Sequence, residues 1–454
     1  MDKFAKKIKK VFFLSFITNF YNLVQGFQLD TTQWQEVDIT NNFIQQNFIQ
    51  FSGDTRIHDS LQLSQTKYAN LIRSSDESDG EILIQVLDEY GNQQCSKTIS
   101  VEYICKYSLT NTNVEGEFFF AYTSEVSLNF YQVFFGFSDQ KCNFNRGLSA
   151  PVQPVKFTDT SFFSVLSKKG KEYIYVVIQQ FQSSSQRFLY LMIVDIRDTS
   201  TYKIKKHVKL GTTNFRYNLF SFQAFSDDYA VILGKDDNDR LNKITIEPSG
   251  SSVWDTPKDK GIFLDLNTNN NFIQNKVIQI ENTNKYSIVT GDREQDILTI
   301  YTFQYNGNGE IQDICLESYQ NQFGSVGNQF FRYLEFGVIN QDFIWIKGEK
   351  ENDNKKTLIF FANPLDCQVY RNPEDSSIYQ YQLDHFGLTH IFHTSYINQT
   401  VSLIASSSHI DGNDSQNLKA IRIILEGKYK QFQKIYQILS VQVIFSNINF
   451  IIQK

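Results

Sequence analysis

Runs of apolar residues return along the chain as pairs, each pair separated by a short polar turn. The clearest pair covers residues 229–246, YAVILGKDDNDRLNKITI. Short runs rich in β-branched and aromatic residues, bounded by Gly, Asp and Asn, are typical of a β-hairpin. Similar pairs occupy residues 286–303, YSIVTGDREQDILTIYTF, and 343–361, FIWIKGEKENDNKKTLIFF. The pattern therefore predicts a repeated hairpin.

Seven hairpins of this kind are expected, with starts 50 to 58 residues apart. They begin near Tyr68, Phe118, Tyr173, Tyr229, Tyr286, Phe343 and Val401. A short apolar strand precedes the hairpin in several units, and a more polar strand follows it. Repeats of about 50 residues with four antiparallel strands have the length and content of β-propeller blades.

The second strand of each unit is almost continuously apolar, which is expected where both faces of a sheet are covered by neighbours. The predicted fold class is all-β, a single β-propeller domain over residues 27–454 with four-stranded antiparallel blades. Seven hairpins favour seven blades. Residues 440–454 predict an extra C-terminal strand segment, and residues 34–39 resemble a fourth strand without its own blade. Pairing these two ends would give eight blades. Because the chain stops within an apolar run, a fragment of a longer protein is a further alternative.

The first 26 residues resemble a secretory signal peptide. Five lysines, at positions 3, 6, 7, 9 and 10, precede an apolar run over residues 11–24, with cleavage expected after Gly26. A retained signal anchor is the alternative, but polar residues interrupt the run, which then spans a bilayer poorly. Cleavage would leave no transmembrane span and a net charge of −10. Nucleic acid is therefore not an expected partner.

Composition supports a folded, strand-rich and secreted chain. The 454 residues are 41% hydrophobic and 15% aromatic, enough for a large core and suited to strands. The five cysteines leave at least one unpaired or paired with another chain. By proximity the first expected disulfide joins Cys95 to Cys105, and the second choice joins Cys105 to Cys142. Asn398 and Asn413 head sequons and are predicted glycosylation sites.

Acidic hairpin tips are the main candidates for metal binding. Asp236, Asp237 and Asp239 occupy one tip, and Asp411 with Asp414 another. Neither tip has the spacing and glycine of a calcium loop, so solvated turns explain them as well. No cofactor is expected, and calcium is the one ion these tips suggest. Among the histidines His385, His390 and His393, the last two lie three apart, so on a strand they face opposite sides.

The motifs do not indicate a particular reaction. The chain has no GxSxG nucleophile, no P-loop and no dinucleotide-binding glycines. The paired glycine of kelch repeats is missing, and the Trp-Asp pair of WD repeats occurs once, at 254–255. We expect a secreted or cell-surface, non-catalytic binding or adhesion module whose partner is protein or glycan. The alternatives are a propeller hydrolase or lyase with acids at a central channel, and a structural surface protein of which this chain is a fragment.

Overall fold

The computed structural model describes the strands and part of the turns. The described residues are 27–38, 56–64, 66–73, 81–88, 90, 92–100, 103–127, 130–144, 153–155, 162–181, 187–215, 220–224, 230–236, 240–248, 254–264, 272–273, 277–280, 283–292, 297–305, 311–320, 334–350, 356–371, 376–378, 380–383, 389–397, 400–410 and 416–429. Contacts divide the chain into a smaller unit, residues 1–35, 396–402 and 424–454, and a larger unit, residues 36–395 and 403–423.

The larger unit contains six antiparallel sheets, each made of consecutive strands, which we call blades 1 to 6. The strands of blades 1 to 3 are β2 (Arg56–Ser64), β3 (Lys67–Arg73), β4 (Glu81–Asp88) and β5 (Gln93–Ser100); β6 (Tyr103–Asn111), β7 (Glu117–Ser127), β8 (Phe130–Asp139) and β9 (Gln153–Val155); β10 (Phe162–Lys169), β11 (Tyr173–Phe181), β12 (Arg187–Asp195) and β13 (Lys203–Thr212). Within each blade the spatial order follows the sequence order.

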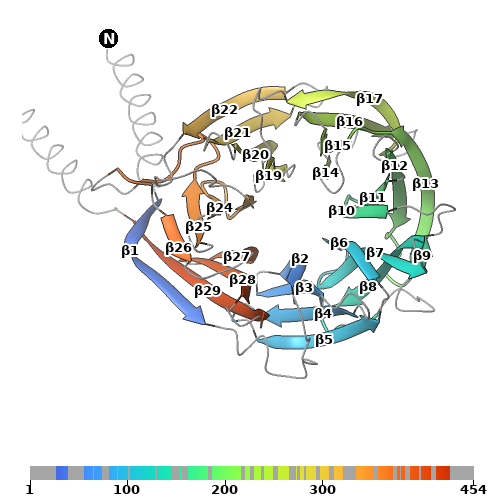
Figure 1. The fold of residues 1–454 in the computed structure, drawn as a ribbon, viewed down its shortest axis with the longest axis horizontal. Coiled ribbons are helices and arrows are strands. Elements are labelled where there is room, and N and C mark those ends of the chain that lie inside the picture. The colour runs from blue at the N-terminus through green and yellow to red at the C-terminus, as the bar shows by residue number, and fades with distance from the viewer. Residues whose placement is uncertain are drawn as a thin grey trace, which may run out of the picture. The chain divides into compact units, whose positions relative to one another are not determined.

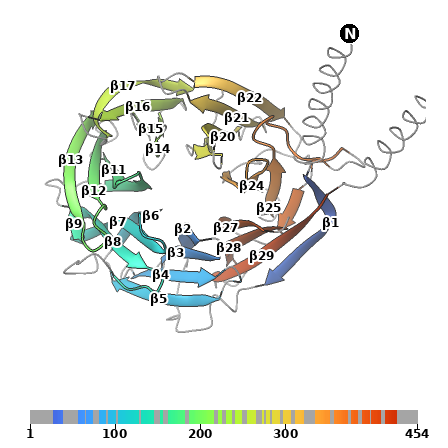
Figure 2. The same cartoon turned by 180° about the vertical axis from the view of Figure 1, so that it is seen from behind.

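Blades 4 to 6 repeat this arrangement with one addition. Their strands are β14 (Phe220–Ala224), β15 (Ala230–Lys235), β16 (Leu241–Pro248) and β17 (Trp254–Leu264); β18 (Phe272–Ile273), β19 (Ile278–Gln279), β20 (Lys285–Asp292), β21 (Ile297–Tyr305) and β22 (Ile311–Gln320); β23 (Glu335–Val338), β24 (Ile344–Lys350), β25 (Lys356–Ala362) and β26 (Gln380–Leu383). In blade 5 both β18 and β19 pair with β20. Successive blades lie side by side around a common centre, first strands innermost and fourth strands outermost (Figures 1 and 2).

The chain therefore has the β-propeller fold with four-stranded antiparallel blades, as the sequence predicted. The larger unit holds six blades, fewer than the predicted seven or eight. One further sheet has the order β1 (Phe27–Asp38), β29 (Gln416–Tyr429), β28 (Thr400–Ile410) and β27 (Thr389–Ile397). Its strands are divided between the two units, and it takes up the N-terminal strand that an eighth blade would have needed.

Each predicted hairpin corresponds to the second and third strands of a sheet, so the repeat in the sequence is the repeat of the fold. The predicted signal peptide, residues 1–26, and the predicted extra segment, residues 440–454, lie outside the described residues. A single domain over residues 27–454 stays a prediction.

The second strand of a blade is buried on both faces, which explains its continuous apolar sequence. Every residue of β11 except the last is buried. Ile174 and Val176 belong to a core shared with blade 2, whereas Tyr175 and Val177, on the opposite face, belong to a core shared with blade 4. Successive side chains of a strand point to opposite faces. One strand thus supplies two interfaces, and burial of each such side chain contributes roughly 1.5–3 kcal/mol.

Two disulfides join neighbouring blades at equivalent positions of the repeat. Cys95, on the outer strand of blade 1, bonds to Cys142, in the turn after the third strand of blade 2; their Cα atoms are 5.9 Å apart. Cys315, on the outer strand of blade 5, bonds to Cys367 in the matching turn of blade 6, with Cα atoms 5.8 Å apart. Both turn cysteines have left-handed backbones, with φ of 58° and 61°.

The two pairings expected from sequence proximity are therefore wrong. Cys105 lies on β6, the innermost strand of blade 2, whereas Cys95 lies on β5, the outermost strand of blade 1. The chain crosses from the outside of one blade to the inside of the next between them. Ten residues of sequence separation consequently do not bring these two cysteines together, and Cys142 is the partner that lies beside Cys95.

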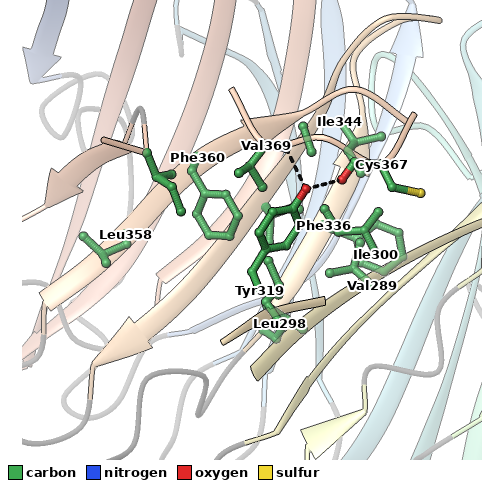
Figure 3. Close-up of a cluster of buried hydrophobic side chains, with 14 residues drawn as sticks. Val289, Leu298, Ile300, Tyr319, Phe336, Ile344, Leu358, Phe360, Cys367 and Val369 are labelled. Atoms are coloured by element: carbon green, nitrogen blue, oxygen red, sulfur yellow. Dashed lines mark hydrogen bonds between the residues drawn. The ribbon is translucent and has the colours of Figure 1, made fainter. Parts of the chain in front are cut away.

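A tyrosine closes the core beside the second disulfide (Figure 3). The hydroxyl of Tyr319, on the outer strand of blade 5, donates to the carbonyl oxygen of Cys367 at 2.7 Å. The hydroxyl oxygen of Tyr319 also accepts from the backbone N–H of Val369 at 3.2 Å. Its ring is packed with Phe336 and Phe360 of blade 6. The turn of blade 6 is thus held to blade 5 by a covalent bond, two hydrogen bonds and apolar contact.

Truncating a leucine between two blades should cost much more stability than truncating a leucine on the surface. Leu233 is fully buried in the core shared by blades 4 and 5, whereas Leu316 is 54% exposed. We expect Leu233→Ala to lower the free energy of unfolding by about 2–5 kcal/mol, because it leaves a cavity. Leu316→Ala should change it by less than about 0.5 kcal/mol. Denaturant midpoints would measure both, and equal midpoints would contradict the double-sided core.

Tryptic mapping without reductant should identify the disulfides. Cleavage after Lys97, Lys106 and Lys141 puts Cys95, Cys105 and Cys142 in separate peptides. We expect the peptide containing Cys95 to remain linked to residues 142–146, because those two cysteines lie side by side. The peptide over residues 98–106 should run alone. Its linkage to the Cys95 peptide would contradict the packing of blades 1 and 2.

Candidate functional site

An ordered turn between β12 and β13 forms the candidate site in blade 3. Asp195, the last residue of β12, accepts hydrogen bonds from the backbone N–H of Arg197 at 3.1 Å and from its Nε at 3.0 Å. The Nη2 group of Arg197 lies 2.5 Å from Oδ2 of the same carboxylate. The backbone N–H of Ile196 donates to the carbonyl of Glu172 at 3.1 Å, which ties this turn to the one between β10 and β11.

A second carboxylate orders the rest of the turn. Asp198 accepts from the backbone N–H and hydroxyl of Ser200, at 2.8 and 2.7 Å, and from the hydroxyl of Thr201 at 2.7 Å. Asp, Ser and Thr favour such turns because their side chains bond to nearby backbone groups. Local hydrogen bonds between neighbours in sequence therefore hold the whole segment.

These contacts determine the charge of the turn. The hydrogen bond from Arg197 holds the pKa of Asp195 below its ordinary value, and the Asp195 carboxylate in turn raises the pKa of Arg197. The hydroxyls of Thr201 and Ser200 lower the pKa of Asp198. Both acids are therefore ionised at neutral pH. The side chain of Arg197 remains 56% exposed, so it can still meet a ligand.

Aromatic rings of blades 2 and 3 pack against two residues of the turn. Tyr202 packs against Phe135 and Phe137 of blade 2, with ring centroids 5.5 and 5.8 Å apart. The guanidinium carbon of Arg197 lies 5.6 Å from the ring centre of Tyr173. The ring of Tyr173 is itself buried against blade 4. The polar turn is therefore packed against both cores of blade 3, the one shared with blade 2 and the one shared with blade 4.

The same turn in other blades shows what blade 3 has changed. The third strand of blade 1 ends at Asp88, whose carboxylate accepts from the backbone and side chain of Asn92. The third strand of blade 2 ends at Asp139, which accepts from Asn143 in the same way. In blade 3 the guanidinium of Arg197 replaces the asparagine amide on Asp195. The blade 3 turn thus bonds its carboxylate through an exposed cationic side chain, whereas the exposed Lys141 of the blade 2 turn donates to Asp139 through its backbone N–H.

The turn lines a shallow, open depression of about 580 Å³. Its lining residues are Asp195, Arg197, Asp198, Thr201, Tyr202 and Lys203. Guanidinium, ammonium, hydroxyl and phenol groups in one concave surface are suited to a polar or partly anionic ligand. The sequence interpretation did not include these residues. The segment DIRDTSTYK is a plain turn by pattern, and only the fold shows that its side chains share one surface.

The predicted acidic tips have a different outcome. Asp236 is buried at the end of β15, and its carboxylate accepts from the backbone N–H, Nε and Nη2 of Arg240 at 2.9, 3.2 and 3.1 Å. The Asp236 carboxylate therefore pairs with Arg240 across the turn of its own hairpin. The other predicted ligands, Asp237, Asp239, Asp411 and Asp414, lie outside the described residues. Calcium binding by those tips stays a prediction.

The remaining predicted sites lie largely beyond the described residues. Asn398, Asn413 and His385 are outside them, and β27 carries His390 and His393. Within the residues that the structure covers, no three His, Cys, Asp or Glu side chains gather closely enough to hold a metal ion. The described part of the chain contains no helix with the length and apolarity needed to cross a bilayer.

Solved structures with a similar fold were found by comparison with known proteins. No family model matches the chain, and no curated protein matches it. The BP39L lectin from Burkholderia pseudomallei is 8% identical with a TM-score of 0.47, covering 79% of this chain and 93% of that one. The WD40 domain of SCAP from fission yeast is 10% identical with a TM-score of 0.43, covering 89% and 97%. The Nup133 β-propeller domain from Vanderwaltozyma polyspora is 8% identical with a TM-score of 0.40, covering 88% and 100%.

Removing the guanidinium should raise the pKa of one carboxyl group in the turn and leave its neighbour unchanged. In Arg197→Gln, we expect the pKa of Asp195 to rise toward 3.8, because its main hydrogen-bond donor is lost. The pKa of Asp198 should stay low, since Thr201 and Ser200 still donate to it. NMR titration of the two carboxyl carbons would measure both. An unchanged Asp195 pKa would contradict the geometry of the ion pair.

Proposed function

We propose that this chain is a secreted or cell-surface β-propeller that binds a protein or glycan partner without catalysing a reaction, and that the depression on blade 3 is its contact site. The observation that carries this proposal is the exposed guanidinium of Arg197 on an internally hydrogen-bonded turn. A ligand that meets such a turn orders few side chains on binding, so little of the interaction energy is lost to entropy.

The protonation of the two carboxylates supports binding over catalysis at this site. Hydrolysis of a glycosidic bond needs a general acid, which is a carboxyl group whose pKa is raised so that it holds a proton near neutral pH. Asp195 and Asp198 both have lowered pKa values, for the reasons given above. They can accept hydrogen bonds from a ligand, but neither has a proton to donate at neutral pH.

The disulfides support a secretory route. Two bonds between blades, Cys95–Cys142 and Cys315–Cys367, would persist in an oxidising compartment, whereas cytosolic thiols are kept reduced. This agrees with the signal peptide expected over residues 1–26 and with glycan acceptors expected at Asn398 and Asn413. Secretion of an epitope-tagged chain, with loss of residues 1–26 shown by N-terminal sequencing, would test the localisation.

The site can be tested on a glycan array and on intact cell surfaces with the full secreted chain. We expect Arg197→Ala with Lys203→Ala to weaken binding about ten-fold or more, because both exposed cations of the depression are lost. Lys141→Ala is the matched control, since Lys141 is exposed in the equivalent turn of blade 2. Equal binding by the double variant and the wild type would contradict this site.

A further inference from the structure

The outer strand of blade 3 is a strongly basic surface on an acidic protein. The chain has a net charge of −6, yet the ten residues of β13, KIKKHVKLGT, include four lysines, one histidine and no acidic residue. The first five are exposed. We call Lys203, Lys205, Lys206 and Lys209 the basic strip. The outer strand of blade 5, β22, instead carries Asp313 and Glu317, so a run of lysines is not a general property of outer strands.

Aromatic rings hold two of these ammonium groups in place. Lys205 Nζ donates to the hydroxyl of Tyr173 at 3.0 Å and lies 4.7 Å from the centre of its ring. Lys209 Nζ lies 3.7 Å from the ring centre of Phe188 and 5.8 Å from that of Tyr190. The quadrupole of an aromatic ring attracts a cation without neutralising it. Both ammonium groups are therefore held at defined positions.

Protection of the sheet edge does not account for this strip. Lysines on an edge strand discourage pairing with another chain, and a charge of either sign can do so. The acidic residues of β22 and the single Lys97 of β5 serve other edges of the same fold. On β13 the charged residues are all positive, and the row continues into the depression through Lys203. Protection of the edge does not require such a row. It is what a partner with repeated negative charges would need.

The backbone of β13 indicates how that partner is bound. Its pairing with β12 shifts register twice, between Leu189 and Tyr190 and between Ile193 and Val194. Such irregularities bend a strand and disrupt its edge, whereas an added peptide strand requires a regular row of N–H and C=O groups. Recognition through side chains is therefore favoured over β-strand addition. This favours a charged polysaccharide over an extended acidic peptide.

We propose that the basic strip binds a linear anionic polysaccharide bearing sulfate or carboxylate groups. Lys205 and Lys209 are four residues apart, a span of about 13 Å along a strand. They contact rings on opposite faces of the sheet, Tyr173 toward blade 4 and Tyr190 toward blade 2. A polymer that follows the outer edge of the sheet would meet them with different anionic groups. One end of the strip opens into the depression beside Arg197. This proposal rests on the proposed binding function and specifies its ligand class.

The test uses immobilised heparin as the sulfated probe, with soluble poly-glutamate and neutral dextran as competitors, and the full secreted chain. We expect heparin to bind and dextran not to compete. Lys205→Gln with Lys209→Gln should weaken binding about ten-fold or more and reduce its salt dependence, because two charge contacts are lost. Lys205→Arg with Lys209→Arg should retain binding to within about three-fold, since the charges remain.

The matched control removes two lysines from other outer strands. Lys97→Gln with Lys258→Gln takes the same charge from β5 and β17, and Lys97 also lies over an aromatic ring, that of Phe144 at 5.9 Å. Equal loss in this control would overturn the proposal, because binding would follow total charge. Stronger competition by poly-glutamate than by free heparin would overturn it in favour of an acidic peptide.

The failure of this proposal can be told from the failure of the proposed function. If heparin does not bind, but a glycan or cell surface still binds through Arg197 and Lys203, only the anionic ligand class is wrong. If the glutamine variant unfolds, as shown by its circular dichroism, the arginine variant decides the question alone. Loss of heparin binding in a folded arginine variant would overturn a charge-based site.

Discussion

Burial of the second strand of each blade on both faces is the constraint on which the structure depends. β11 sends alternate side chains into two cores, one with blade 2 and one with blade 4, and no residue between Tyr173 and Gln180 is left to face water. A single blade would expose both of those faces. Each blade therefore requires its neighbours, and the cooperative unit is a series of blades.

This constraint also explains where chemical variety is found. Strands in the cores accept little besides apolar residues, because a buried polar group without a partner is costly. Turns and outer strands are free of that restriction, and they differ most between blades. Asp195 occupies the same turn position as Asp88 and Asp139, but its partner is Arg197. Function in this fold is thus inferred from differences between equivalent turns.

The sequence predicted the strands well, but it predicted poorly which residues of different blades lie beside one another. The continuous apolar run from Tyr173 to Ile178 predicts a strand that is buried on both faces, and that local pattern needs no tertiary information. The partner of Cys95 could not be predicted in this way, because Cys142 reaches it across a boundary between blades. The depression was missed for the same reason, since Tyr202 is supported by rings from blade 2. The blade count failed where strands from both ends of the chain share one sheet.

The left-handed backbone of Cys142 and Cys367 has a consequence for how this protein can change over evolutionary time. Residues with a side chain rarely adopt this conformation, and Gly and Asn do so most readily. If a lineage lost either bridge, serine or alanine at the turn would keep the backbone strain that cysteine has there, without the bond that offsets it. Descendants without the bridge should therefore carry glycine or asparagine at these two positions, while Cys95 and Cys315, on ordinary strands, would be free to become almost any polar residue.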